Sequence, residues 1–165
     1  TPGSVVTSSI EGSRPILLEV QALVTPSSFG YPQRVSNGFD QKRLSILLAV
    51  LEKRAGVRAS VHNVFVNVAG GIRVFEPAAD LAVCVSIASS LADKVVDNQT
   101  IIIGEVGLGG EIRSVGYIEK RIAEANKLGF KTAVVPIGNL KSLKQSDSIK
   151  IISVENVKDA IEKLL

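Results

Sequence analysis

Residues 61–92 read VHNVFVNVAGGIRVFEPAADLAVCVSIASSLA and hold a predicted strand, turn and helix in close succession. Val61–Val68 is predicted to be a strand, because valine recurs at every second position in its second half. The glycine pair at 70–71 indicates a tight turn into a second short strand, Ile72–Phe75. Pro77 suits the first turn of a helix that fills the rest of the stretch. Its apolar residues lie on several faces, so we expect it to be buried nearly all round.

The segments on either side are also predicted as strands and helices, from the spacing of their apolar residues. Alternating apolar residues predict a strand over Ile16–Val24, and the Pro, Ser and Gly content of Thr25–Asn37 predicts a long loop. A helix with four leucines on one face is predicted from Asp40 to Gly56. The later predicted elements are a strand over Ile101–Val106, a glycine-rich turn at 107–110, a short strand around Ile112, a helix through Ile118, Ile122 and Ala125, a strand over Thr132–Val135, a short helix near Leu140, a strand over Ile149–Val154 and a terminal helix with Val157, Ile161 and Leu164 inward.

A β-rich opening followed by a repeating αβ pattern predicts the α/β (α+β) class, with a mixed sheet and packed helices. We find no internal repeat and no linker, so residues 1–165 are expected to form a single domain. The chain contains no methionine, and we therefore expect it to be a fragment of a longer protein.

Composition sets limits on the function. No apolar stretch reaches the roughly 18–20 residues of a membrane span, so no membrane partner is expected. The lone Cys84 cannot form an internal disulfide, which fits a reducing compartment. The net charge is +3 and the isoelectric point about 9.1. This excess permits nucleic-acid binding, but many domains with other functions share it.

Motifs for common chemistry are missing. No G-x-x-x-x-G-K followed by Ser or Thr occurs, so there is no P-loop. Gly107–Gly110 lacks a following lysine, and a hairpin turn is favoured there over a phosphate site. A partly buried structural role is favoured for His62, and core packing for Cys84. We expect no cofactor and no metal in this chain.

Basic residues are the remaining candidates for ligand contacts. Some flank residues 36–40 and others lie near predicted turns. Scattered basic residues usually form a solvated surface, and no aromatic interleaving suggests base stacking. The candidate DNA contacts are Arg14, Arg34, Lys42, Arg43, Arg73 and Arg113.

Several motifs together resemble one protein family. In order along the chain, they lie at Pro2–Val6, Glu11–Pro15, Phe65–Gly71, Glu76–Ala82, Gly104–Arg113 and Arg121–Phe130. They resemble the C-terminal domain of the bacterial-type RadA (Sms) family of DNA repair proteins, over nearly the whole chain. That domain is similar in turn to the Lon proteolytic domain, which implies a Lon-like, ribosomal protein S5 domain 2-like fold.

The resemblance also assigns the positions of the Lon catalytic dyad. Lon proteases place a serine in a G-P-S-A-G turn and a lysine in a later G-G-L-K-like turn. Here the first turn has Ala78 at the serine position, and the second, Gly116–Glu119, has Glu119 at the lysine position. A methyl group cannot attack a carbonyl and a carboxylate cannot replace the lysine amine, so no catalytic residue is expected.

RadA-like proteins resemble fusions of a zinc finger, a RecA-like ATPase and this Lon-like domain. The resemblance implies an ATP-dependent DNA helicase in homologous recombination, with ATP, Mg and Zn bound outside this chain. It also implies a homo-oligomer, expected to be a hexamer, single-stranded or branched DNA and a recombinase as partners, and the bacterial cytoplasm or a plant chloroplast or mitochondrion. The alternative is an active or peptide-binding Lon-class serine protease domain.

Overall fold

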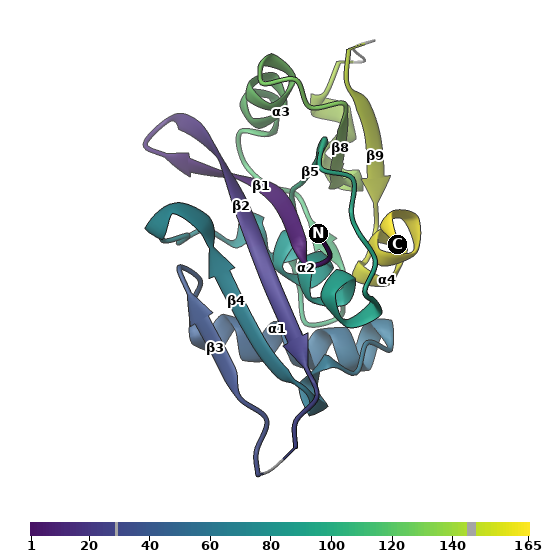
Figure 1. Ribbon diagram of the computed structural model, residues 1–165. Helices are drawn as coiled ribbons and strands as arrows, with labels where there is room; N and C mark the ends of the chain where they lie inside the picture. Colours follow the sequence, from purple (N-terminus) through teal and green to yellow (C-terminus); the bar gives the residue numbers. More distant parts are fainter. Residues whose placement is uncertain (29, 145–147) are drawn as a thin grey trace.

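The computed structural model describes residues 1–28, 30–144 and 148–165 (Figure 1). A seven-stranded sheet has the order β3-β4-β2-β1-β5-β8-β9, and β6 and β7 pair separately. The strands are β1 (Ser4–Glu11), β2 (Arg14–Thr25), β3 (Arg34–Asn37), β4 (Asn63–Val68), β5 (Thr100–Ile102), β6 (Glu105–Val106), β7 (Ile112–Arg113), β8 (Thr132–Pro136) and β9 (Lys150–Val154). The helices are α1 (Gln41–Ala55), α2 (Asp80–Ala92), α3 (Ile118–Lys127) and α4 (Val157–Leu164), with 3₁₀ turns η1 (Ala59–Val61), η2 (Ala69–Gly71), η3 (Pro77–Ala79) and η4 (Ile137–Ser142).

The sheet mixes parallel and antiparallel pairs. β1 and β2 form a long antiparallel hairpin, and β4 pairs antiparallel to β2. β3 runs parallel to β4, and β5, β8 and β9 continue from β1 as a parallel set. The α/β class with a mixed sheet and packed helices is thus confirmed.

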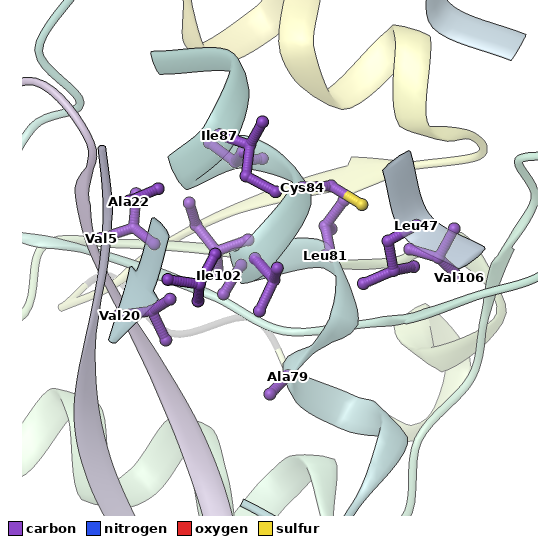
Figure 2. Close-up of a cluster of buried hydrophobic side chains, with 14 of the residues drawn as sticks. Val5, Val20, Ala22, Leu47, Ala79, Leu81, Cys84, Ile87, Ile102 and Val106 are labelled. Atoms are coloured by element: carbon purple, nitrogen blue, oxygen red, sulfur yellow. The ribbon is translucent and has the colours of Figure 1, made fainter. Parts of the chain in front are cut away.

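Helices cover both faces of the sheet. Ile102 and Val134 pack in a cluster with residues of α1, α2 and α4, whereas their neighbours Ile101 and Ala133 pack in a second cluster with α3. The first cluster centres on α2, whose residues 80–89 are all buried, as Figure 2 shows for Leu81, Cys84 and Ile87. The prediction of a helix buried nearly all round and of a core cysteine is confirmed.

Local signals set the ends of α1 as predicted. The Asp40 side chain accepts a hydrogen bond from the Arg43 backbone N–H and caps the first turn. Gly56 ends the helix in the left-handed conformation, with φ 67°. Leu44, Leu47, Leu48 and Leu51 all face the core.

Three predictions about strands were wrong, and one strand was missed. Ile72–Phe75 is irregular, because Gly70 and Gly71 both have positive φ and Val74 N–H bonds to the Gly38 carbonyl instead of a strand. β3 lies within the segment predicted as a loop. It was not predicted because it forms by pairing with β4, a tertiary contact that local sequence does not show. β1 was not assigned. The predicted strand Ile101–Val106 is instead two strands, β5 ending at Ile102 and β6 beginning at Glu105, because Gly104 bonds to the turn before α2.

Candidate functional site

The segment Glu76–Asp80, here called the η3 turn, connects an irregular loop to α2. Ala78 is 3% exposed and packs in the second core cluster beside Ile101 and Ile118. Its carbonyl accepts a hydrogen bond from Gly104 N–H at 2.9 Å, and Leu81 N–H donates to the Gly104 carbonyl at 3.0 Å. The residue at the expected nucleophile position therefore faces an apolar cluster.

Gly104 explains how the chain approaches the η3 turn so closely. A Cβ added there would lie 2.7 Å from Ile112 Cγ2 and 3.3 Å from Leu81 Cδ2. Both of these side chains are buried, so neither could move aside at low cost. Glycine at this position lets the backbone exchange hydrogen bonds with the η3 turn.

Glu119, at the expected lysine position, is exposed in the first turn of α3. It lines a surface hollow of about 300 Å³ together with Ile122, Ala123 and Leu143. The core-facing positions of the helix belong to Ile118, Ile122 and Ala125. Glu119 thus lies at the solvent side of α3 while Ala78 lies in the core.

A buried ion pair joins the η3 turn to α3 instead. Arg121 is 2% exposed, and its Nη1 and Nη2 donate to the two carboxylate oxygens of Glu76 at 2.6 and 3.0 Å. Nη1 also donates to the Ser8 carbonyl at 2.8 Å, and Nε to the Gly116 carbonyl at 2.9 Å. Ile10 N–H donates to Glu76 at 3.0 Å. This bidentate pair, which we call the Glu76–Arg121 bridge, ties η3, α3 and β1 together.

A second ion pair holds the other end of the η3 turn. The Asp80 carboxylate is fully buried and accepts hydrogen bonds from Arg43 Nε at 3.1 Å, from Arg43 Nη2 and from Val106 N–H at 3.1 Å. Arg43 Nη2 also donates to the Val106 carbonyl at 2.7 Å. Burial raises the pKa of the Asp80 carboxyl, and the hydrogen bonds from Arg43 and Val106 oppose this rise. The Arg43 guanidinium is therefore directed into the protein.

Most of the residues predicted to contact DNA lie on different elements of the molecule, and two of the six line a common pocket. Arg43 and Arg73 line the same pocket of about 340 Å³ beside the η3 turn. Arg14 is exposed at the hairpin end, opposite Glu11. The others lie elsewhere: Arg34 on the edge strand β3, Lys42 exposed on α1, and Arg113 on β7 in a 3.0 Å ion pair with Glu111. Their role in DNA binding stays a prediction.

The loop before the η3 turn, Ile72–Phe75, differs from the turn in its exposure. Phe75 is 85% exposed, with the guanidinium of Arg73 at 5.6 Å from the ring centre. Across the Glu76–Arg121 bridge, Tyr117 is 54% exposed and the Lys120 Nζ lies 5.4 Å from its ring centre. Each of these contacts lies within cation–π range.

Comparison with known proteins places the chain in a family. A family model described as subunit ChlI of Mg-chelatase matches residues 38–139. The chain belongs to this family. This matched segment of the ChlI family includes both ion pairs and the η3 turn.

The resemblance to the RadA family is confirmed by curated relatives, each named DNA repair protein RadA. The Bacillus subtilis protein is 48% identical over 163 residues, which cover 99% of this chain and 36% of that protein. The Aquifex aeolicus protein is 51% identical over 164 residues, covering 99% and 36%, and the Streptococcus pneumoniae protein 46% identical over 162 residues, covering 98% and 39%. The chain thus spans little more than a third of the length of these relatives.

Neither ion pair of this ChlI-family chain was predicted from the sequence. A signal did exist for Arg121, because it follows Ile118 by three residues and so falls on the buried face of α3, where an arginine needs an acidic partner. The partner, Glu76, is 45 residues away, so its identity required the fold. For Asp80, its position in the most apolar helix was a similar signal.

Two further features concern metal binding and membrane insertion. Within residues 1–28, 30–144 and 148–165, no three His, Cys, Asp or Glu side chains are grouped so that they could hold a metal ion. In the same part of the chain, none of the helices has the length and apolar character needed to span a membrane. The expectation that the chain binds no metal or cofactor stays a prediction.

Proposed function

We propose that this chain is the non-proteolytic, Lon-like scaffold domain of a RadA-type ATP-dependent DNA helicase in homologous recombination and DNA repair. In this proposal it assembles as a homo-oligomer and contacts DNA, while the ATP, Mg and Zn sites lie in parts of the parent protein outside this chain. One observation carries the proposal: the chain matches RadA relatives over nearly its whole length, yet has Ala78 and Glu119 at the dyad positions.

The geometry of the η3 turn supports the absence of proteolysis. Nucleophilic catalysis by a serine needs a hydroxyl within hydrogen-bond reach of a base, and an open position for the carbonyl substrate. At this turn, position 78 faces an aliphatic cluster. The Glu76–Arg121 bridge joins the two segments between which the dyad would form.

Labelling with a serine-directed fluorophosphonate probe tests this part of the proposal. We expect no serine to be labelled in the folded chain, because Ala78 and Glu119 occupy the dyad positions and the buried Ser86 and Ser89 of α2 already donate hydrogen bonds to backbone carbonyls. Covalent labelling of any serine in the folded chain would contradict the scaffold proposal.

The alternative, a peptide-binding Lon-class domain, has one observation in its favour. The pocket beside the η3 turn has a volume of about 340 Å³, which could receive a peptide side chain. Binding of unfolded polypeptide such as casein, in competition with DNA for this pocket, would favour the alternative.

DNA binding is proposed for the exposed basic residues. Arg14, Lys42 and Arg73 are exposed and make no ion pair in the described part of the chain, so they can contact phosphates. Arg34 donates to the Ser60 carbonyl at 3.4 Å and Arg113 is paired with Glu111, which makes them weaker candidates. Arg43 has the geometry of a structural residue.

The salt dependence of DNA affinity tests this assignment. Affinity should fall steeply with salt concentration, because each phosphate contact releases counterions. Replacing Arg14, Lys42 and Arg73 together by alanine should weaken binding and reduce the salt slope by about two to three. The matched control is Lys158→Ala, an exposed lysine on α4. An affinity that does not change with salt would contradict phosphate contacts.

Oligomerisation is proposed from the family resemblance, with a hexamer as the expected assembly. The mass of the chain in solution, measured by light scattering or native mass spectrometry over a range of concentrations, tests it. A monomer at all concentrations would contradict a platform role for this domain. The recombinase partner and the compartment, bacterial cytoplasm or plant organelle, are likewise proposals; the relatives named above are bacterial proteins.

A further inference from the structure

Two aromatic rings with adjacent cations lie beside the buried bridge. Phe75 directly precedes Glu76, and Lys120 directly precedes Arg121, so each cation–aromatic pair includes the residue next in sequence to one end of the Glu76–Arg121 bridge. Tyr117 is tied to the same bridge, because the preceding carbonyl, that of Gly116, accepts from Arg121 Nε. The two pairs, Arg73–Phe75 and Lys120–Tyr117, thus lie in two segments, more than 40 residues apart in the sequence, that this bridge joins.

The backbone of Tyr117 is a second observation at this surface. Its φ is 59°, in the left-handed region, which disfavours residues that have a bulky side chain. The other non-glycine residue with positive φ in the described part of the chain is Asp93, which ends α2, where such a conformation is common. Residues held in unfavourable conformations gather at binding sites, where they direct a side chain. Here the effect is that the ring stands at the start of α3, 54% exposed.

The charges near these rings favour an anionic ligand. The two carboxylates of the η3 turn are already paired, Glu76 with Arg121 and Asp80 with Arg43. Arg73 and Lys120 form no ion pair in the described part of the chain, so both remain available. Asp40, which lines the same pocket as Arg73, and Glu119, the exposed neighbour of Lys120 on α3, are carboxylates that oppose an anion there.

We propose that the pairs Arg73–Phe75 and Lys120–Tyr117 form a stacking surface for the bases of single-stranded DNA. Every base has a flat face that an aromatic ring can stack on without regard to sequence, and a cation beside the ring can contact the adjoining phosphate. Duplex DNA has its bases stacked internally and cannot use the rings in this way. The inference rests on the proposed DNA binding and adds to it the residues that contact the bases.

Fluorescence anisotropy with a labelled oligothymidylate tests the proposal, alongside an abasic oligonucleotide of equal length. Phe75→Ala and Tyr117→Asn each remove one ring, and asparagine tolerates the left-handed backbone at 117. Each variant should weaken oligothymidylate binding by about five- to 100-fold. Neither should change affinity for the abasic strand. Phe75→Trp should restore affinity.

The matched control is Tyr31→Ala. Tyr31 is 95% exposed and has no cation over its ring in the described part of the chain, so its loss should leave affinity unchanged. If the two ring variants bind oligothymidylate as tightly as the unaltered chain, or if a duplex competes as well as the single strand, the stacking surface is wrong while phosphate-driven DNA binding stands. If the unaltered chain binds neither strand nor duplex, the proposed function fails together with this inference.

Discussion

Two adjoining segments of one connection, the loop Ile72–Phe75 and the η3 turn Glu76–Asp80, have opposite environments. In the loop, Arg73 and Phe75 are exposed, and the Arg73 guanidinium lies over the Phe75 ring. In the turn, Ala78 is buried, and the carboxylates at both ends are held by arginines from α3 and α1. The segment that would carry a nucleophile in a Lon protease is thus part of the core, and the side chains free to meet a ligand lie just before it. We expect residues of the turn to determine stability and residues of the loop to determine binding, so mutations should separate the two properties.

The largest effect is expected from breaking the Glu76–Arg121 bridge. Arg121→Met leaves the Glu76 carboxylate without its partner, and Glu76 is 25% exposed, so we expect a loss of about 3 kcal/mol in the free energy of unfolding. Urea denaturation followed by circular dichroism measures it. Arg113→Met breaks the exposed pair with Glu111 and should have a much smaller effect on the free energy of unfolding, because solvent screens an exposed ion pair. Equal losses for the two variants would contradict the role given to the bridge.

The second pair should behave similarly with a smaller loss. Asp80→Ala leaves Val106 N–H without its carboxylate acceptor, and deprives the partly exposed Arg43 of its charged partner, at a cost of about 2 kcal/mol. Asp40→Ala, which removes an exposed helix cap, should cost about 1 kcal/mol. The same denaturation experiment ranks the two, and a reversed order would show that the Arg43–Asp80 pair contributes little.

Cys84 gives a pH test of how well α2 is enclosed. Burial raises the pKa of its thiol, whereas the thiol of the unfolded chain ionises near pH 8.5. Below that pH the contribution to stability is complete, and as the pH rises above it only the unfolded thiol loses its proton. The free energy of unfolding should then fall by about 1.4 kcal/mol per pH unit more than in Cys84→Ala. Identical slopes between pH 9 and 10.5 would indicate a solvated thiol.

A smaller gain is expected at Thr7 on β1. Its hydroxyl is buried and has no hydrogen-bond partner in the described part of the chain. Thr7→Val keeps the shape and removes the unsatisfied group, so stability should rise by about 1 kcal/mol. The contrasting variant is Ser86→Ala, which removes a buried hydroxyl that donates to the Val83 carbonyl at 2.8 Å. Ser86→Ala should therefore raise the free energy of unfolding by less than Thr7→Val does, or lower it.

The smallest effect on stability is expected in the loop. Phe75→Ala should change the free energy of unfolding by less than about 0.5 kcal/mol, because the ring is 85% exposed. A loss comparable to that of Arg121→Met would show that the ring contributes to the core, and would remove the distinction between loop and turn.

Sequence patterns predicted the parts of this fold that depend on local periodicity. The leucine face of α1, the apolar helix α2 and the strand β4 follow from spacing alone. The edge strand β3 and the break at Gly104 did not, because each depends on a partner far away in the chain. For the site, the resemblance located Ala78 and Glu119. The Glu76–Arg121 bridge and the cation–aromatic pairs depend on the fold, since Glu76 and Arg121 are 45 residues apart in the sequence.

The most direct test of the central claim is to restore both dyad side chains. The double variant Ala78→Ser, Glu119→Lys should remain unlabelled by a fluorophosphonate probe and should not cleave casein. Position 78 faces an aliphatic cluster, and the Glu76–Arg121 bridge still joins the η3 turn to α3. Labelling of Ser at position 78 in the folded variant would contradict the account, because it would show that the catalytic geometry survives and that only two side chains separate this domain from a protease.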